Sequence, residues 1–228
     1  MLIEGKQGVK TLIKAVLFDL DGTLVNSLTD LANAFNYALR SFGFPEHETE
    51  EYKLFVGDGI PKAIERALPE KNRGAETINK VMAVFFEHYK VHFADNTASY
   101  EGMPELIKQL KDQGIKLAVV TNKAQFMADK VVKKIYGDAF DIIFGKREDV
   151  PAKPDPTAAL MVMDELRVKP FECIFLGDSK NDVLTGFNSG AYAVGELWGY
   201  RGKKELRENK AQFIISKPSE LLDIIRKC

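Results

Sequence analysis

Short runs of apolar residues alternate along this chain with stretches in which apolar residues recur at helical spacing. The first run covers residues 15–18 and stops at Asp19. A continuous apolar run of this length is typical of a strand that is buried on both faces of a parallel sheet. Further strands are predicted at residues 115–120, 141–144, 173–176, 191–194 and 213–215. Strands that alternate with helices in this order indicate βαβ units and an α/β fold.

The stretch between the first two predicted strands is helical. From about residue 28 to about residue 94 no run predicts a buried strand, and helices are predicted at residues 29–43, 60–68 and 75–92. Later helices are predicted at residues 103–113, from 124, at 156–166, from 182 and at 219–227. Because the first strand must join the later ones in one sheet, the helical block is interpreted as an insertion. We expect a Rossmann-like α/β core, a parallel sheet flanked by helices, from residues 1–25 and 97–228, with a helical cap over residues 26–96.

Composition and charge exclude several classes of protein. The 228 residues are 45% hydrophobic and 29% charged, which is ordinary for a soluble globular protein. The net charge of −1 gives no electrostatic reason to expect nucleic acid or an anionic membrane as a partner. No apolar run approaches the roughly 20 residues of a transmembrane helix, and residues 1–10 lack the apolar core of a signal peptide. Two cysteines offer no disulfide framework, so a cytoplasmic location is expected.

Four loops that follow predicted strands carry polar side chains suited to one phosphate site. The first holds two carboxylates, Asp19 and Asp21, followed by Gly22 and Thr23. Ligands of parallel sheets bind outside the carboxyl ends of the strands, which is where these carboxylates are expected to lie. Two aspartates at this spacing are common by themselves. Their position directly after a buried strand leads to the hypothesis that they take part in phosphate chemistry.

The other three loops add donors and a further acid. Thr121 and Asn122 precede a predicted helix, whose free N–H groups favour phosphate. Lys153 lies between prolines in the segment at residues 152–156, before another predicted helix. Its ammonium supplies a point charge for a phosphoryl oxygen. Asp178 belongs to the loop at residues 177–182. With the first two carboxylates it makes an all-oxygen cluster, which suits Mg²⁺ rather than zinc.

At these residues the chain resembles the haloacid dehalogenase-like (HAD) hydrolase superfamily, in its phosphoglycolate phosphatase-like branch. Its four motifs occur here in order: DxDGT at residues 19–23, Thr121, Lys153, and GDxxxD at residues 177–182. Residues 55–68 are also similar to the cap of phosphoglycolate phosphatases, with Gly57, Asp58 and Gly59 in the loop where a cap would reach the substrate. The resemblance covers nearly the whole chain and implies a HAD core with a C1-type cap.

The resemblance implies the catalytic and metal-binding roles of the carboxylates. Asp19 would attack phosphorus and form an aspartyl-phosphate, and Asp21 would protonate the leaving alcohol and then deprotonate water. Mg²⁺ would bind Asp19, the backbone carbonyl of Asp21, and Asp178. Dehalogenases lack an acid at the position of Asp21, because a halide leaves without a proton. Its presence here favours phosphate esters over haloacids.

The resemblance also implies how phosphate is held. Thr121 and Lys153 would bind phosphoryl oxygens, with the Asn122 amide beside them, and act mainly on the charge that spreads in the transition state. Asp182 would stand behind these groups and orient Lys153 or a metal-bound water.

These features together predict a Mg²⁺-dependent phosphatase for a small phosphomonoester, with 2-phosphoglycolate as the best single candidate. Other small metabolites remain open as substrates, namely sugar phosphates, nucleoside monophosphates and pyrophosphate. A β-phosphoglucomutase-type phosphotransferase and a non-catalytic HAD-like binding protein are the alternative functions. The expected partner is a small phosphorylated metabolite, with no nucleic acid or membrane, and the chain is expected to be a monomer or a homodimer.

Overall fold

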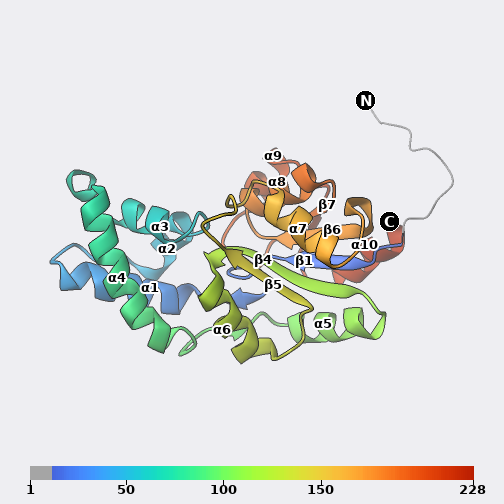
Figure 1. Ribbon diagram of the computed structural model, residues 1–228, viewed down its shortest axis with the longest axis horizontal. Helices are drawn as coiled ribbons and strands as arrows, with labels where there is room; N and C mark the ends of the chain where they lie inside the picture. The colour runs from blue at the N-terminus through green and yellow to red at the C-terminus, as the bar shows by residue number, and fades with distance from the viewer. Residues whose placement is uncertain (1–11) are drawn as a thin grey trace.

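The computed structural model describes residues 12–228, and its centre is a six-stranded sheet (Figure 1). The strand order is β5-β4-β1-β6-β7-β8, and every pairing between neighbours is parallel. The strands are β1 (Ala15–Phe18), β4 (Lys116–Ala124), β5 (Ile142–Lys146), β6 (Cys173–Gly177), β7 (Tyr192–Glu196) and β8 (Phe213–Ile215). The predicted α/β fold with a parallel sheet is confirmed. Residues 1–11, which the expected core boundary and the signal-peptide argument include, lie outside the described residues.

Helices cover both faces of this sheet. They are α5 (Met103–Asp112), α6 (Gln125–Tyr136), α7 (Thr157–Glu165), α8 (Lys180–Ser189), α9 (Lys203–Glu208) and α10 (Glu220–Lys227), with a 3₁₀ turn η3 (Pro170–Glu172). One face of β1 packs through Val16 and Phe18 into the cluster that α5, α6 and α10 share. The other face packs through Leu17 toward α7. The first strand is therefore buried on both sides, which is why its sequence is a continuous apolar run.

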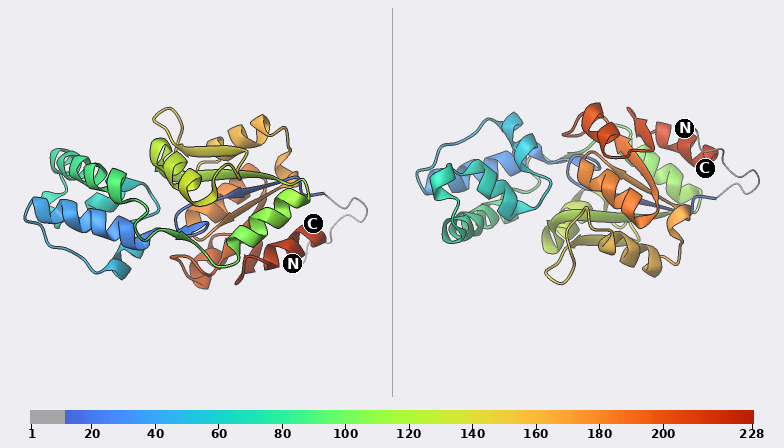
Figure 2. Two further views of the ribbon diagram at one scale, coloured as in Figure 1. Left: turned by 90° about the horizontal axis from the view of Figure 1, so that it is seen from below. Right: turned by 90° about the horizontal axis from the view of Figure 1, so that it is seen from above.

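The helical block between β1 and β4 forms a layer of its own beside the core (Figure 2). It contains α1 (Leu28–Ser41), α2 (Tyr52–Phe55), α3 (Ile60–Ala67) and α4 (Ala75–His92), with 3₁₀ turns η1 (Thr49–Glu51) and η2 (Glu70–Asn72). Aromatic side chains fill its centre: the Phe35 ring lies 5.1 Å from that of Tyr52 and 4.5 Å from that of Phe85. In the part of the chain that the structure describes, no helix is long and apolar enough to cross a membrane.

Three local features differ from the expected elements. A two-stranded antiparallel ribbon, β2 (Val25–Asn26) with β3 (Ala98–Ser99), joins the helical layer to the core. Strands of two residues are too short to show a period in the sequence, so nothing local predicts them. Strand β4 continues to Ala124, beyond the expected end at residue 120. Helix α8 begins at Lys180 rather than near residue 182, because Ser179 and Asp182 form a capping box.

Asp30 fastens the start of α1 to the segment that leads into the ribbon. Its carboxylate is 2% exposed and accepts hydrogen bonds from the backbone N–H groups of Asn96, at 3.0 Å, and Thr97, at 2.8 Å. The Asn96 amide and the Thr97 hydroxyl add two more, each at 2.7 Å. A buried carboxylate without a cation beside it is stable only because this many donors surround it.

Replacing Asp30 by Asn should lower the free energy of unfolding by about 2 kcal/mol, since hydrogen bonds to a charged acceptor are lost and an amide N–H then faces other donors. Urea unfolding followed by circular dichroism measures the change. Asp164→Asn, on the exposed face of α7, is the matched control and should change stability by less than about 0.5 kcal/mol. Equal stability of the two variants would contradict the role given to Asp30.

Candidate active site

The carboxyl end of the sheet meets the helical layer at a cavity of about 60 Å³. Most of the residues singled out from the sequence line it: Asp19, Asp21, Gly57, Gly59, Thr121, Asn122, Lys153, Asp178 and Asp182. They come from the ends of β1, β4 and β6, from the loop before α7, from the first turn of α8 and from the loop before α3. The side of the cavity that the helical layer provides is apolar, formed by Leu31, Val56, Ile60 and Ala63.

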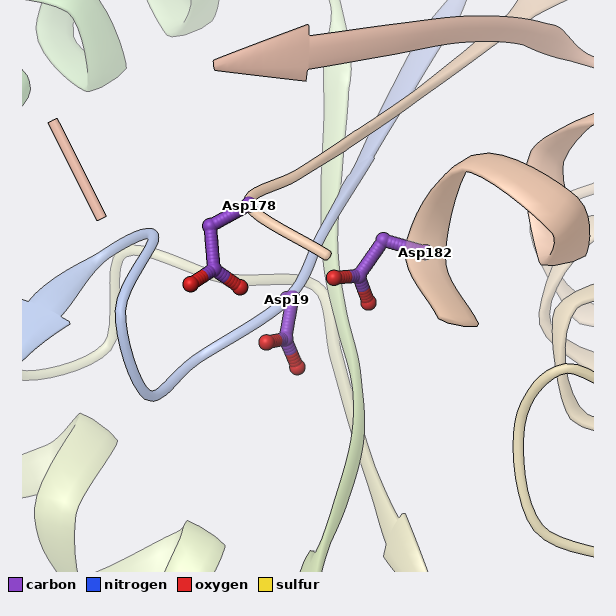
Figure 3. Close-up of side chains that lie close together, drawn as sticks. All are labelled: Asp19, Asp178 and Asp182. Carbon is purple, nitrogen blue, oxygen red and sulfur yellow. The ribbon is translucent and has the colours of Figure 1, made fainter. Parts of the chain in front are cut away.

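Three buried carboxylates converge at the floor of this cavity (Figure 3). Asp19 follows β1, Asp178 follows β6 and Asp182 lies in the first turn of α8. One oxygen of each lies within 4.8 Å of the others, and the residues are 8%, 3% and 1% exposed. The side chain of Asp21 lies apart from this group, and the expected metal contact through its backbone carbonyl stays a prediction.

Lys153 supplies the positive charge inside the acidic group. Its Nζ lies 2.6 Å from Asp19 Oδ1 and 2.6 Å from Asp182 Oδ1. Burial opposes a charge on this ammonium, but Asp182 and Asp19 together raise its pKa above the usual range. Asp182 thus forms a direct ion pair with Lys153, and its expected role in orienting that lysine stays a prediction. Asp182 is held in turn by Ser179, whose N–H and hydroxyl donate to its second oxygen at 3.0 and 2.6 Å.

One ammonium does not neutralise three carboxylates. Burial raises the pKa of Asp19 to about 6, and repulsion from Asp182 adds to this against the opposing effect of Lys153. Burial, with Asp182 and Asp19, raises the pKa of Asp178 well above its usual range. Buried carboxylate oxygens with an excess of negative charge are the donors that a hard divalent cation prefers.

Glu196, at the end of β7, is an additional buried acid that the sequence reasoning missed. Its Oε2 accepts the N–H groups of Trp198, at 2.6 Å, and Gly199, at 3.1 Å, while its Oε1 has no hydrogen-bond partner among residues 12–228. Burial, with Asp178 next, raises its pKa to about 10. A Cβ on Gly199 would lie 2.4 Å from Asp178 Cβ and 2.5 Å from Glu196 Oε1, so only glycine fits between them. The signal in the sequence that could have identified Glu196 is an acidic residue close to the end of a predicted strand.

Asn122 lies between two loops rather than standing free in the cavity. Its side-chain oxygen accepts the Lys153 N–H at 2.9 Å, and its amide donates to the carbonyls of Lys153, at 3.2 Å, and Gly57, at 2.9 Å. The Thr121 hydroxyl accepts the N–H of Lys123 at 3.2 Å. Helix α6 begins at Gln125, next to the start expected near residue 124, although β4 runs on to Ala124.

Asp21 is paired with Lys123, a residue that carried no role in the sequence analysis although it adjoins Thr121 and Asn122. Lys123 Nζ lies 2.9 and 3.0 Å from the two Asp21 oxygens. The Ser27 hydroxyl donates to Asp21 Oδ1 at 2.5 Å. A lysine is ordinarily a surface residue, so only its 7% exposure in the folded chain identifies it as part of the site.

Polar side chains of the core hold the loop at residues 56–59 over the cavity. Asn181 donates to Gly57 O at 3.3 Å and to Asp58 Oδ1 at 2.7 Å, and Arg201 donates to Val56 O at 3.1 Å. Asp58 itself points away from the cavity to Arg66; burial opposes its charge, but the bonds from Asn181 and Arg66 lower its pKa. Gly57 and Gly59 have φ angles of +113° and +89°, which disfavour any side chain there.

Comparison with known proteins places this arrangement in one family. The chain matches the haloacid dehalogenase-like hydrolases over residues 16–195. A phosphoglycolate phosphatase from Psychrobacter arcticus is 32% identical over 219 residues, covering 93% of this chain and 95% of that protein. One from Aquifex aeolicus is 30% identical over 93% of this chain and 97% of that protein. The crystal structure of a phosphoglycolate phosphatase candidate from Lactobacillus delbrueckii subsp. bulgaricus matches with a TM-score of 0.89 and 29% identity, covering 94% of this chain and 98% of that one. The chain therefore belongs to the haloacid dehalogenase-like hydrolases, in their phosphoglycolate phosphatase-like branch.

Proposed function

We propose that this phosphoric monoester hydrolase cleaves small phosphomonoesters with the help of Mg²⁺, through an aspartyl-phosphate on Asp19, and that 2-phosphoglycolate is its best substrate. The observation that carries the proposal is the position of Asp19. It lies at the end of β1 and lines the cavity, 2.6 Å from the Lys153 ammonium and within the three-carboxylate group. The names of the curated relatives, similar over almost the whole chain, support the choice of substrate.

In the first step an Asp19 oxygen forms a bond to phosphorus while the bond from phosphorus to the ester oxygen breaks. Asp21 gives its proton to the departing oxygen, so that the product leaves as an alcohol. In the second step Asp21 takes a proton from water, whose oxygen attacks phosphorus and restores Asp19 as a carboxylate. Lys153 holds phosphoryl oxygens throughout, with the Thr121 hydroxyl as a further donor.

The acidic group fits a divalent cation. Lys153 pairs with two of the three buried carboxylates, Asp19 and Asp182, and Glu196, whose Oε1 has no hydrogen-bond partner among residues 12–228, belongs to the same buried region. Asp19, Asp178 and the backbone carbonyl of Asp21 would hold Mg²⁺, with Asp182 beside them. Bound there, the ion would offset the repulsion between a carboxylate nucleophile and a phosphate dianion.

The size and lining of the cavity support a small substrate. A volume of about 60 Å³ suits a phosphoryl group with few further atoms. Residues 26–96 would act as the cap over the core of residues 1–25 and 97–228, excluding water during the first step. The tests below also distinguish the alternative substrates, which are sugar phosphates, nucleoside monophosphates and pyrophosphate. They distinguish the alternative reaction as well, which is phosphoryl transfer between sugars.

We also place the enzyme in the cytoplasm. Both cysteines are free thiols, and burial, with Glu172 next, raises the pKa of Cys173 to about 12. A buried thiol of this kind packs as a small apolar side chain and is suited to a reducing compartment. Monomer and homodimer are both compatible with the site.

The primary test is phosphate release from a panel of small esters that includes 2-phosphoglycolate. Asp19→Asn should lower kcat by at least about 1,000-fold, because the nucleophile is lost. Asp164→Asn serves as a matched control and should keep full activity. Release that persists in Asp19→Asn would contradict the aspartyl-phosphate route. Equal rates on all esters would withdraw 2-phosphoglycolate, and an isomerised sugar phosphate without free phosphate would identify a mutase.

The second test is thermal unfolding with Mg²⁺ and with EDTA. Wild-type protein should gain about 2.7 kcal/mol at a Mg²⁺ concentration about 100 times the dissociation constant. Asp178→Asn should lose this gain and yet be at least as stable as wild type in EDTA. A carboxyl whose pKa is raised by folding destabilises the fold once the pH exceeds its unfolded value, and the amide removes that cost. An unchanged Mg²⁺ effect in Asp178→Asn would contradict the metal site.

A further inference from the structure

The ammonium of Lys123 connects the core to the helical cap. Lys123 lies near the end of β4, and its Nζ is 2.9 Å from the hydroxyl of Tyr89 on α4. The two residues are 7% and 1% exposed. The same Nζ is bound to both oxygens of Asp21, at 2.9 and 3.0 Å. Tyr89 therefore reaches the Asp21 carboxylate through one lysine, although it belongs to the other layer of the molecule.

This contact uses the whole donor capacity of the lysine. An ammonium has three N–H donors and no acceptor. Here the acceptors around it are the two Asp21 oxygens and the Tyr89 oxygen. Burial raises the pKa of Tyr89 to about 12, so its hydroxyl remains neutral and accepts from the lysine. Without that hydroxyl one N–H of a buried ammonium would have no partner, which is costly enough to favour another position of the side chain.

The position of Lys123 decides the position of Asp21. Within the part of the chain that the structure describes, the other hydrogen bond to the Asp21 carboxylate comes from the Ser27 hydroxyl, at 2.5 Å from Oδ1. Both residues line the cavity, and the side chain of Asp21 is 20% exposed whereas that of Lys123 is 4% exposed. The lysine thus holds the carboxylate at the cavity wall and leaves it the more accessible of the two side chains.

We propose that Tyr89 is a positioning residue for proton transfer by Asp21 and that it acts through Lys123. The inference rests on the proposed function, in which Asp21 protonates the leaving group. When α4 is packed on the core, Tyr89 completes the contacts of Lys123, and Lys123 holds both oxygens of Asp21. The cap then contributes to the chemistry as well as covering the cavity, because the proton donor is fully oriented only with the cap in place.

Tyr89→Phe isolates this contribution, because it removes one oxygen and keeps the ring that packs 5.3 Å from Phe85. The matched control is Tyr52→Phe, which removes the buried hydroxyl that donates to Asn36 at 2.5 Å in the same cap cluster. Tyr52 makes no hydrogen bond toward the Asp21 group in the described residues. Each variant loses one hydrogen bond made by a buried tyrosine of the cap, so a general loss of cap stability would affect them alike.

The readout is the rate at which the leaving group is released in a single turnover with enzyme in excess, compared between two leaving groups. Release of the leaving group reports only the first step. Glycolate leaving from 2-phosphoglycolate needs a proton, whereas nitrophenolate leaving from p-nitrophenyl phosphate is a stable anion at neutral pH. Tyr89→Phe should slow glycolate release about tenfold and nitrophenolate release less than about twofold, since general acid catalysis matters only for the poorer leaving group. Tyr52→Phe should show no such split.

Asp21→Asn separates failure of this inference from failure of the proposed function. It should show the same split with a larger loss on 2-phosphoglycolate, roughly 100-fold or more. Suppose that Asp21→Asn slows 2-phosphoglycolate more than p-nitrophenyl phosphate, while Tyr89→Phe slows the two substrates equally or slows neither of them. The role of Tyr89 is then overturned and the role of Asp21 stands. If Asp21→Asn itself shows no split, the proposed role of Asp21 is overturned and the inference falls with it.

Discussion

The active site depends on one buried ion-pair arrangement, the ammonium of Lys153 between Asp19 and Asp182. The two contacts, each 2.6 Å long, join the end of β1, the loop before α7 and the first turn of α8. These segments are distant in the chain, and only the parallel sheet brings them to one edge. Without the ammonium two buried carboxylates would face each other, so the loop that carries Lys153 is essential to the local fold.

The charges of this arrangement do not balance, because the acidic groups outnumber the ammonium of Lys153. Asp178 and Glu196 add acid beyond what Lys153 can balance, and burial is the first cause of the raised pKa of each. The free energy that this costs is supplied elsewhere, by a central strand that is buried on both faces and by the helices packed against it. Unfavourable charge held in place by a well-packed scaffold is common at sites that bind a cation and a phosphate.

The cap is attached to the core by contacts of two kinds. Asn122, Asn181 and Arg201 bind backbone carbonyl groups of α2 and of the loop that follows it, so these contacts hold the cap through its backbone. The contact between Tyr89 and Lys123 instead ends on a group that takes part in the proposed chemistry. Closure of the cavity and orientation of Asp21 are therefore properties of the same docked state.

The sequence by itself determined the class of the sheet, the helical character of the insertion, and the order of Asp19, Thr121, Lys153 and Asp178 at strand ends. These features follow from the periodic spacing of apolar residues and from short motifs of neighbouring residues. Local chain geometry is therefore enough to predict them. Only the tertiary structure decided that Lys123 binds Asp21, that Asn122 spans two loops, and that Glu196 joins the acidic region. The ribbon of β2 and β3 likewise pairs strands of two residues from opposite ends of the insertion. Such partners are chosen by contacts between distant segments and by the burial those contacts produce, and neither leaves a periodic signal in the sequence.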